Sequence, residues 1–167
     1  MKRYGIRRLA VYVAVGVFML SAGGATLARE AMEPSAPITD TVLAMGMPED
    51  APGKVLQLER YTIAPGAAIP THIHPGAYVI YVEQGKFGFT AIEGDAELTK
   101  AGSSKSETIA AGSEVIAQSG DTIFENGGVV HSARNAGDTT VVVLTAALLE
   151  AGEPSLQPVD EHGSSSS

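Results

Sequence analysis

The feature that most constrains this chain is a succession of short apolar segments separated by glycines between residues 54 and 146. β-Branched and aromatic residues fill these segments, and short runs of this kind bounded by turn residues are typical of β-strands. No segment shows the apolar spacing of an amphipathic helix of three turns. The pattern therefore predicts an all-β sandwich or barrel. Strands are expected at 55–63, 78–82, 86–92, 114–117, 122–124, 129–134 and 139–146.

Composition changes at both ends of this strand-rich region, which we assign as one domain at residues 54–150. Residues 29–53 are rich in proline, alanine and glycine and predict an extended N-terminal segment, with an edge strand near 41–44. Residues 151–167 end in a run of serines and predict a disordered C-terminal tail. The total length of 167 residues suits a single domain of this kind.

Residues 1–28 carry the pattern of a secretory signal peptide. Basic residues at positions 2, 3, 7 and 8 precede an apolar run from Leu9 to Leu20, and small residues follow. This order predicts cleavage after Ala28, with Ala25 as the second choice. The mature protein is then periplasmic or secreted and is not inserted in a membrane. The alternative is an uncleaved anchor, since Leu9 to Ala28 is long enough to cross a bilayer.

Charge and cysteine content exclude several classes of function. The chain has 11 basic and 19 acidic residues and a net charge of −8, whereas a nucleic-acid-binding surface needs clustered positive charge. We therefore expect no nucleic acid partner. The chain has no cysteine, which excludes a disulfide framework, a thiolate metal site and a catalytic thiol. The four histidines then become the main candidates for a functional site.

Three of the four histidines fall in two short windows. His72 and His74 are separated by one residue, and on a β-strand this spacing places two side chains on the same face, about 6.5 Å apart. His131 lies in another strand-like segment. Three neutral imidazoles on one side of an ion suit Fe, Mn, Ni, Cu or Zn and leave positions open for water or substrate. The fourth histidine, His162, lies in the expected tail, and we expect it to be inert.

The spacing around these histidines resembles the cupin family over about residues 54–150. The first motif of that family is G(X)5HXH(X)3–4E(X)6G, and the second is G(X)5PXG(X)2H(X)3N. The chain matches eight of the ten fixed positions; Tyr78 stands in place of the glutamate and Asn126 in place of the proline. The matching residues are Gly66, His72, His74, Gly85, Gly120, Gly128, His131 and Asn135.

The resemblance implies a double-stranded β-helix, a small jelly-roll barrel with a divalent metal ion held inside one end by His72, His74 and His131. It also implies a small organic substrate and a metal-dependent oxygenase, lyase or isomerase reaction. One alternative is a non-catalytic module that binds or senses a metal or a small ligand. Another is a metal-free structural barrel. A homodimer is expected from the family, with strand edges that could pair.

Tyr78 is the candidate catalytic residue and the main departure from the family pattern. It places a phenol with a pKa of about 10 where the family has an anionic ligand. Three interpretations stay open: Tyr78 does not bind the metal, it binds as a phenolate or through a metal-bound water, or it only packs in a barrel without metal. Other acids that could compensate are Glu125, just before a turn of the second motif, Glu59, and Glu83, which we expect to face outward. Arg134 is expected on the surface.

Overall fold

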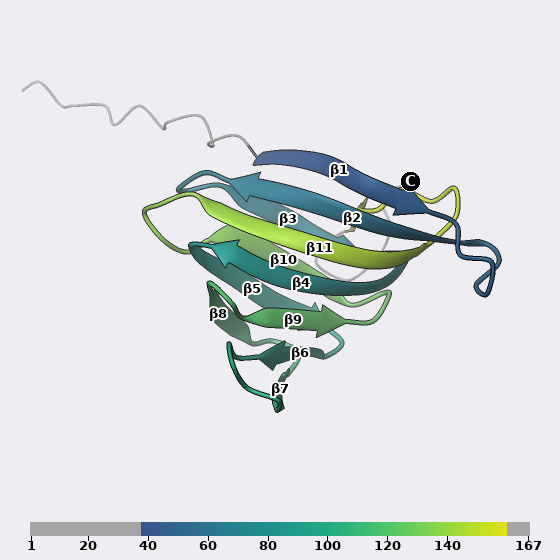
Figure 1. The fold of residues 1–167 in the computed structure, drawn as a ribbon. Helices are drawn as coiled ribbons and strands as arrows, with labels where there is room; N and C mark the ends of the chain where they lie inside the picture. The colour runs from purple at the N-terminus through teal and green to yellow at the C-terminus, as the bar shows by residue number, and fades with distance from the viewer. Residues whose placement is uncertain (1–37, 160–167) are drawn as a thin grey trace, which may run out of the picture. The chain divides into compact units, whose positions relative to one another are not determined.

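The computed structural model describes residues 38–159, and every regular element in this range is a β-strand (Figure 1). The expected signal peptide at 1–28 lies outside the described residues, as do 29–37 and 160–167. The described range contains no helix that is long and apolar enough to cross a membrane. The strands are β1 (Ile38–Gly46), β2 (Lys54–Ile63), β3 (Ala68–Ile73), β4 (Gly76–Gln84), β5 (Lys86–Glu93), β6 (Ala96–Thr99), β7 (Ser106–Ile109), β8 (Glu114–Gln118), β9 (Thr122–Glu125), β10 (Val130–Asn135), β11 (Val141–Glu150) and β12 (Gln157–Pro158).

The strands form two antiparallel sheets that face each other. The larger sheet has the order β1-β2-β11-β4-β9-β6-β7, and the smaller sheet has the order β12-β3-β10-β5-β8. Figure 1 shows the smaller sheet behind the larger one. From β2 to β6, and again from β7 to β12, each strand lies in the other sheet from the strand before it. This crossing between sheets is the jelly-roll arrangement, and the prediction of an all-β jelly roll is confirmed.

The interior between the sheets is filled by the inward faces of alternating strands. In β2, Glu59, Tyr61 and Ile63 are buried, whereas Leu58 and Arg60 are exposed. The alternation in the sequence separates these two faces, and the structure shows which of them is buried. Each large apolar side chain buried in this way stabilises the fold by about 1.5–3 kcal/mol. The apolar centre of the interior includes Ile63, Val82, Phe89, Ile123 and Val141.

A glycine is required where the chain crosses from β4 to β5. Gly85 has a φ of 86°, in the left-handed region that strains residues with a side chain. A Cβ at this position would lie 2.8 Å from the carbonyl oxygen of Thr140, so the turn has no room for one. The other motif glycines, Gly66, Gly120 and Gly128, also have a positive φ.

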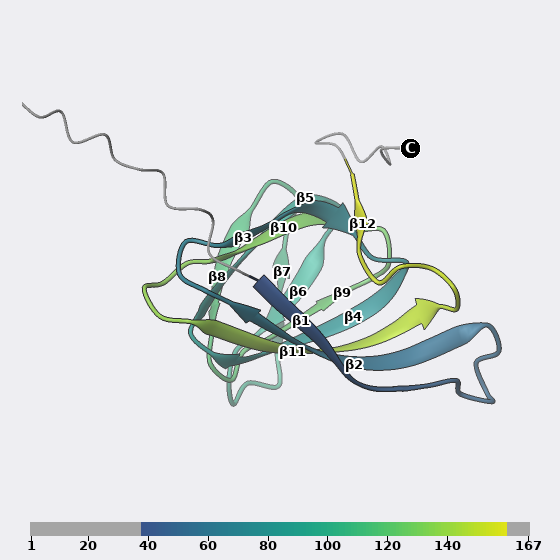
Figure 2. The same cartoon turned by 90° about the horizontal axis from the view of Figure 1, so that it is seen from above.

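The structure differs from the sequence-based expectation at both ends of the domain. Strand β1 begins at Ile38 and pairs along most of β2, so it is longer than the edge strand expected near 41–44. The sequence predicts a disordered tail at 151–167, whereas residues 151–159 run back to the smaller sheet, where β12 pairs with β3 (Figure 2). The free edge of β3 explains this, because the Val159 N–H donates to the carbonyl of Thr71. The tail assignment is therefore corrected for residues 151–159.

Candidate metal centre

The three motif histidines lie together at one end of the barrel interior. His72 lies near the end of β3, His74 follows that strand directly, and His131 on β10 is the cross-strand partner of His72. One ligand nitrogen from each ring lies within 4.8 Å of the others. The side chains are 3%, 6% and 2% exposed, respectively, so the group is shielded from solvent. The structure therefore brings together the three residues that the sequence singles out.

Each of these rings is held by a backbone carbonyl through Nδ1. Because a carbonyl oxygen accepts a hydrogen bond, each Nδ1 carries the proton and each Nε2 keeps a lone pair. Metal-binding histidines are commonly oriented in this way by an acceptor on the other ring nitrogen. The three pairs are His72 with Pro70 at 2.7 Å, His74 with Ser155 at 2.5 Å and His131 with Val129 at 3.2 Å.

Burial lowers the pKa of all three histidines. Burial, with a smaller contribution from His72, lowers the pKa of His74 to about 4. Burial also lowers the pKa of His72, and it lowers that of His131 well below its ordinary value. The rings are therefore neutral at pH 7, which is the form of imidazole that binds a metal ion.

A buried carboxylate lies beside the histidines. Glu125 on β9 is 1% exposed; its Oε1 lies 3.5 Å from Nε2 of His74, and its Oε2 lies 3.1 Å from Nδ1 of His131. Among residues 38–159, neither oxygen has a hydrogen-bond partner. Burial raises the pKa of Glu125 to about 8. Buried polar atoms without partners are uncommon, and a cation in this position would supply the partner. The residues present therefore fit a divalent metal ion.

Tyr78 packs against this group from β4. Its ring is stacked on that of His74, with centroids 3.8 Å apart and an interplanar angle of 24°. Its hydroxyl donates to the carbonyl of Ser155 at 3.2 Å. Burial raises the pKa of the Tyr78 phenol above its ordinary value, so the group is neutral in this environment. A neutral phenol that donates to a carbonyl favours the interpretation in which Tyr78 does not bind the metal.

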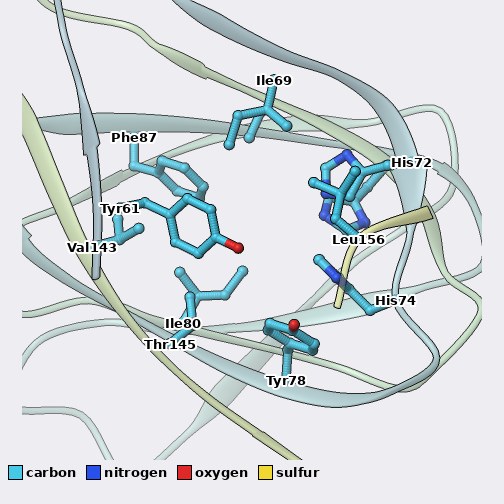
Figure 3. Close-up of a pocket in the computed structure, with 12 residues that line it drawn as sticks. Tyr61, Ile69, His72, His74, Tyr78, Ile80, Phe87, Val143, Thr145 and Leu156 are labelled. Carbon is cyan, nitrogen blue, oxygen red and sulfur yellow. The ribbon is translucent and has the colours of Figure 1, made fainter. Parts of the chain in front are cut away.

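A small cavity of about 30 Å³ opens beside the histidines (Figure 3). This volume is enough for one or a few water molecules, since one water needs about 10–15 Å³. Aromatic and aliphatic side chains form most of the wall, and the hydroxyl groups of Tyr61 and Thr145 add polar atoms. Leu156, from the segment after β11, lines the same cavity as His72 and His74. The C-terminal segment is thus part of the site, which the sequence does not indicate.

A second buried carboxylate, Glu59, differs from Glu125 in being hydrogen-bonded. Gln57 donates to it at 2.5 Å, Tyr61 at 3.3 Å and Thr145 at 3.4 Å. Burial raises the pKa of Glu59, and the negative charge of Asp40 adds to this effect. Since these three hydrogen bonds already provide partners for its carboxylate oxygens, Glu59 does not require a metal ion.

The remaining candidates lie away from the histidines. Glu83 faces outward as predicted, and its carboxylate lies 3.5 Å from Arg60. Arg134 is also on the surface as predicted, where it forms an ion pair with Glu114 at 2.7 Å. Asn135, a motif residue, donates from its amide to two backbone carbonyls and so fixes the loop after β10.

Comparison with solved structures identifies the fold. The L-ribose isomerase of Cellulomonas parahominis superposes with a TM-score of 0.55 at 14% identity, over 75% of this chain and 70% of the isomerase chain. The chain has the cupin fold. At this identity the likeness concerns the fold alone.

Parts of two larger proteins also resemble this chain. A variant of oxalate decarboxylase from Bacillus subtilis is 23% identical over 57% of the chain, with a TM-score of 0.42. Salicylate 1,2-dioxygenase from Pseudoaminobacter salicylatoxidans is 15% identical over 55% of it, with a TM-score of 0.41. The matched parts span 22% of the decarboxylase chain and 20% of the dioxygenase chain. No family model matches the sequence, and no curated protein matches it.

Proposed function

We propose that this cupin holds one divalent metal ion on His72, His74 and His131 and acts there on a small organic molecule. The observation that carries the proposal is the arrangement of the three rings, which are buried, neutral and fixed through Nδ1 with Nε2 left free. Burying polar groups is unfavourable unless they have partners, so a purely structural barrel would be better served by apolar side chains at this end. A metal ion is the partner that suits three imidazoles.

A divalent ion at this site would supply Lewis acidity or a place for O2 activation. The backbone carbonyls bound to Nδ1 fix the direction of the Nε2 lone pairs, and the aliphatic and aromatic wall leaves room for only one or a few water molecules. Tyr61 and Thr145 line the cavity, and because their hydroxyl protons are donated to Glu59, their oxygens could only accept hydrogen bonds from a substrate. Oxygenase, lyase and isomerase reactions are all compatible with this set of ligands and lining residues, and the identity of the metal would indicate which reaction to test.

The second candidate is a module that binds a metal ion without turnover. The observation that favours it is the cavity volume of about 30 Å³, which Leu156 helps to limit. Pockets for small organic ligands usually have volumes of about 300 Å³ or more. A protein that only holds or senses a metal ion needs no larger opening.

Elemental analysis by mass spectrometry tests the metal site on untagged protein exported to the periplasm. We expect about one equivalent of Fe, Mn, Ni, Cu or Zn, lost in His131→Ala and kept in His162→Ala, whose histidine lies outside the described residues. Absence of metal from the wild type, even after reconstitution, would overturn the proposal.

The metal found would then select the activity assays. Iron would lead to O2-uptake measurements with small organic acids, thiols and diketones. Zinc or manganese would lead to lyase and isomerase assays. A stably bound metal with no turnover in any of these assays would favour the second candidate.

We also propose that the protein is exported. The support is the order of basic, apolar and small residues within 1–28. N-terminal sequencing of protein recovered from the periplasm or the medium should begin at Arg29, or at Thr26 for the second cleavage site. A chain that keeps Met1 and sediments with membranes would support the uncleaved anchor instead.

A further inference from the structure

Glu125 is the one side chain among residues 38–159 whose buried polar atoms lack hydrogen-bond partners. Both carboxylate oxygens are affected, and the residue is 1% exposed. An isolated carboxylate is costly to bury, and such groups are normally paired or bound to a metal ion. The other fully buried glutamate, Glu59, follows this rule through its hydrogen bonds to Gln57, Tyr61 and Thr145. The position of Glu125 therefore calls for a partner that the described side chains do not provide.

The surroundings of Glu125 show which kind of partner it lacks. Its Oε1 lies 3.5 Å from Nε2 of His74, on the side of that ring left free by the bond to Ser155. Two atoms that share a first-row ion at about 2.1 Å each lie about 3.0–3.4 Å apart, at octahedral to tetrahedral angles. The observed separation is close to this range. Its Oε2 lies 3.1 Å from Nδ1 of His131, the nitrogen that carries the proton, so this second contact does not lie across a metal ion and only Oε1 is placed to share one.

The strand register explains how Glu125 reaches this position. Glu125 on β9 is the direct cross-strand partner of Tyr78 on β4. Directly opposed residues project to the same face of a sheet, and both side chains here are buried in the interior. Tyr78 occupies the motif position at which the cupin resemblance expects a glutamate. A carboxylate missing from one strand is thus present at the paired residue of the next strand.

We infer that Glu125 is a fourth ligand of the metal centre, a carboxylate supplied by β9 in place of the motif position occupied by Tyr78. The inference rests on the proposed function, because it requires a metal ion at the histidines. A carboxylate adds a negative charge and a hard oxygen donor to three imidazoles. Oxygen donors favour Mn²⁺ more than an all-nitrogen site does, so Glu125 would widen the set of metals that the site accepts.

The test compares Glu125→Gln with Glu59→Gln, which removes the charge of the hydrogen-bonded glutamate as a matched control. Affinity for Mn²⁺ is measured by competitive titration, and the ligand environment is measured from the visible spectrum of the Co²⁺-loaded protein. We expect Glu125→Gln to weaken Mn²⁺ binding at least about tenfold and to shift the Co²⁺ bands. We expect Glu59→Gln to leave both unchanged.

The outcomes separate this inference from the proposed function. Unchanged Mn²⁺ affinity in Glu125→Gln would overturn this inference and leave the proposed function standing. A weaker Mn²⁺ affinity with an unshifted Co²⁺ spectrum would also overturn it, because that result is expected if Glu125 has only a structural role. A wild type that binds none of Mn²⁺, Co²⁺ and Zn²⁺ would overturn the proposed function as well. Urea unfolding of the metal-free protein shows whether the variant folds; Glu125 has to take up a proton on folding at pH 7 and glutamine does not, so Glu125→Gln should be at least as stable as the wild type.

Discussion

The rings of Tyr78 and His74 are stacked, and both side chains donate a hydrogen bond to the same backbone oxygen of Ser155. Tyr78 therefore packs against a candidate ligand and shares its anchor. In this arrangement it limits the rotation of His74 and keeps its free Nε2 directed away from the shared acceptor. The residue that departs from the family motif thus has a positioning role that the geometry explains.

Replacing Tyr78 with phenylalanine should separate this packing from the hydroxyl group. Tyr78→Phe keeps the stack and loses one hydrogen bond, so the free energy of unfolding should fall by about 1 kcal/mol. Metal content should be unchanged, and the rate of any reaction should change. Urea unfolding and elemental analysis measure the first two, with Tyr81→Phe as the control because Tyr81 is 40% exposed on the same strand. Loss of the metal would instead show that the phenol is a ligand, and an unchanged rate would remove Tyr78 from the mechanism.

The metal-free protein should be most stable near pH 6.5. The folded histidines have pKa values below 6.5, that of His74 about 4, so the unfolded chain binds more protons and stability is lost as pH falls below 6.5. Burial raises the pKa of Glu125 from 4.5 to about 8. The folded protein then keeps a proton that the unfolded chain has released, so stability is lost as the pH rises from 4.5 to 8. Between pH 4.5 and 6.5 three histidines outweigh the two buried carboxylates whose pKa is raised, Glu125 and Glu59.

Urea unfolding with a chelator across pH 4.5 to 8.5 measures this profile, in which each proton changes the slope by at most about 1.4 kcal/mol per pH unit. Glu125→Gln should remove most of the decline above pH 6.5 and keep the decline at acid pH. A wild type whose stability still rises between pH 6.5 and 8 would contradict the assignment of Glu125 as a buried, protonated group.

Shortening Leu156 should open the site. Leu156 is half-buried against the cavity, so Leu156→Ala should lower the free energy of unfolding by about 1–2 kcal/mol, less than for a fully buried leucine. The rate at which a chelator removes the metal should rise several-fold, while the metal content at equilibrium stays the same. Leu148→Ala, at a leucine that is 38% exposed on the outer sheet face, is the matched control. Equal removal rates in the two variants would show that Leu156 does not limit access.

The outer face of the larger sheet should mediate the homodimer that the family resemblance predicts. Val79 is the cross-strand partner of both Ala146 and Phe124, and Val79 and Phe124 are 43% and 38% exposed. The solvent face of an antiparallel sheet is usually polar, and monomers rarely expose large apolar patches. Light scattering should therefore give twice the monomer mass for the wild type. Val79→Glu should be monomeric, because it places a charge in the apolar face. The control variant Gln118→Glu, on the smaller sheet, should remain a dimer. A monomeric wild type would contradict the prediction.

The fold and the histidine group could be predicted from the sequence because both depend on local patterns. The alternation in β2 separates its two faces, although only the structure shows which face is buried. The spacing of His72 and His74 determines that they lie close together, and the second motif places His131 beside them. These patterns can be recognised in the sequence without knowing how distant strands pair.

Two features of the site could not be settled in this way, although Glu125 is one of the three acids that the sequence offers. The inward position of Glu125 depends on the register between β4 and β9, which no local pattern reveals. The role of Ser155 depends on its backbone oxygen, and a backbone oxygen has no signature in the sequence. The polar composition around Ser155 predicts a tail, although a free strand edge and a buried histidine hold this segment in place.

The contact between His74 and Ser155 joins residues separated by 81 positions, and Ser155 belongs to the last described segment. A polypeptide is synthesised from its N-terminus, so all three histidines emerge before the carbonyl that orients one of them. His74 therefore has no carbonyl partner until the chain has been made at least as far as Ser155. Export of an unfolded chain would place the assembly of this site after the membrane crossing, and the ions available in that compartment, rather than those in the cytoplasm, would then decide which metal the protein carries.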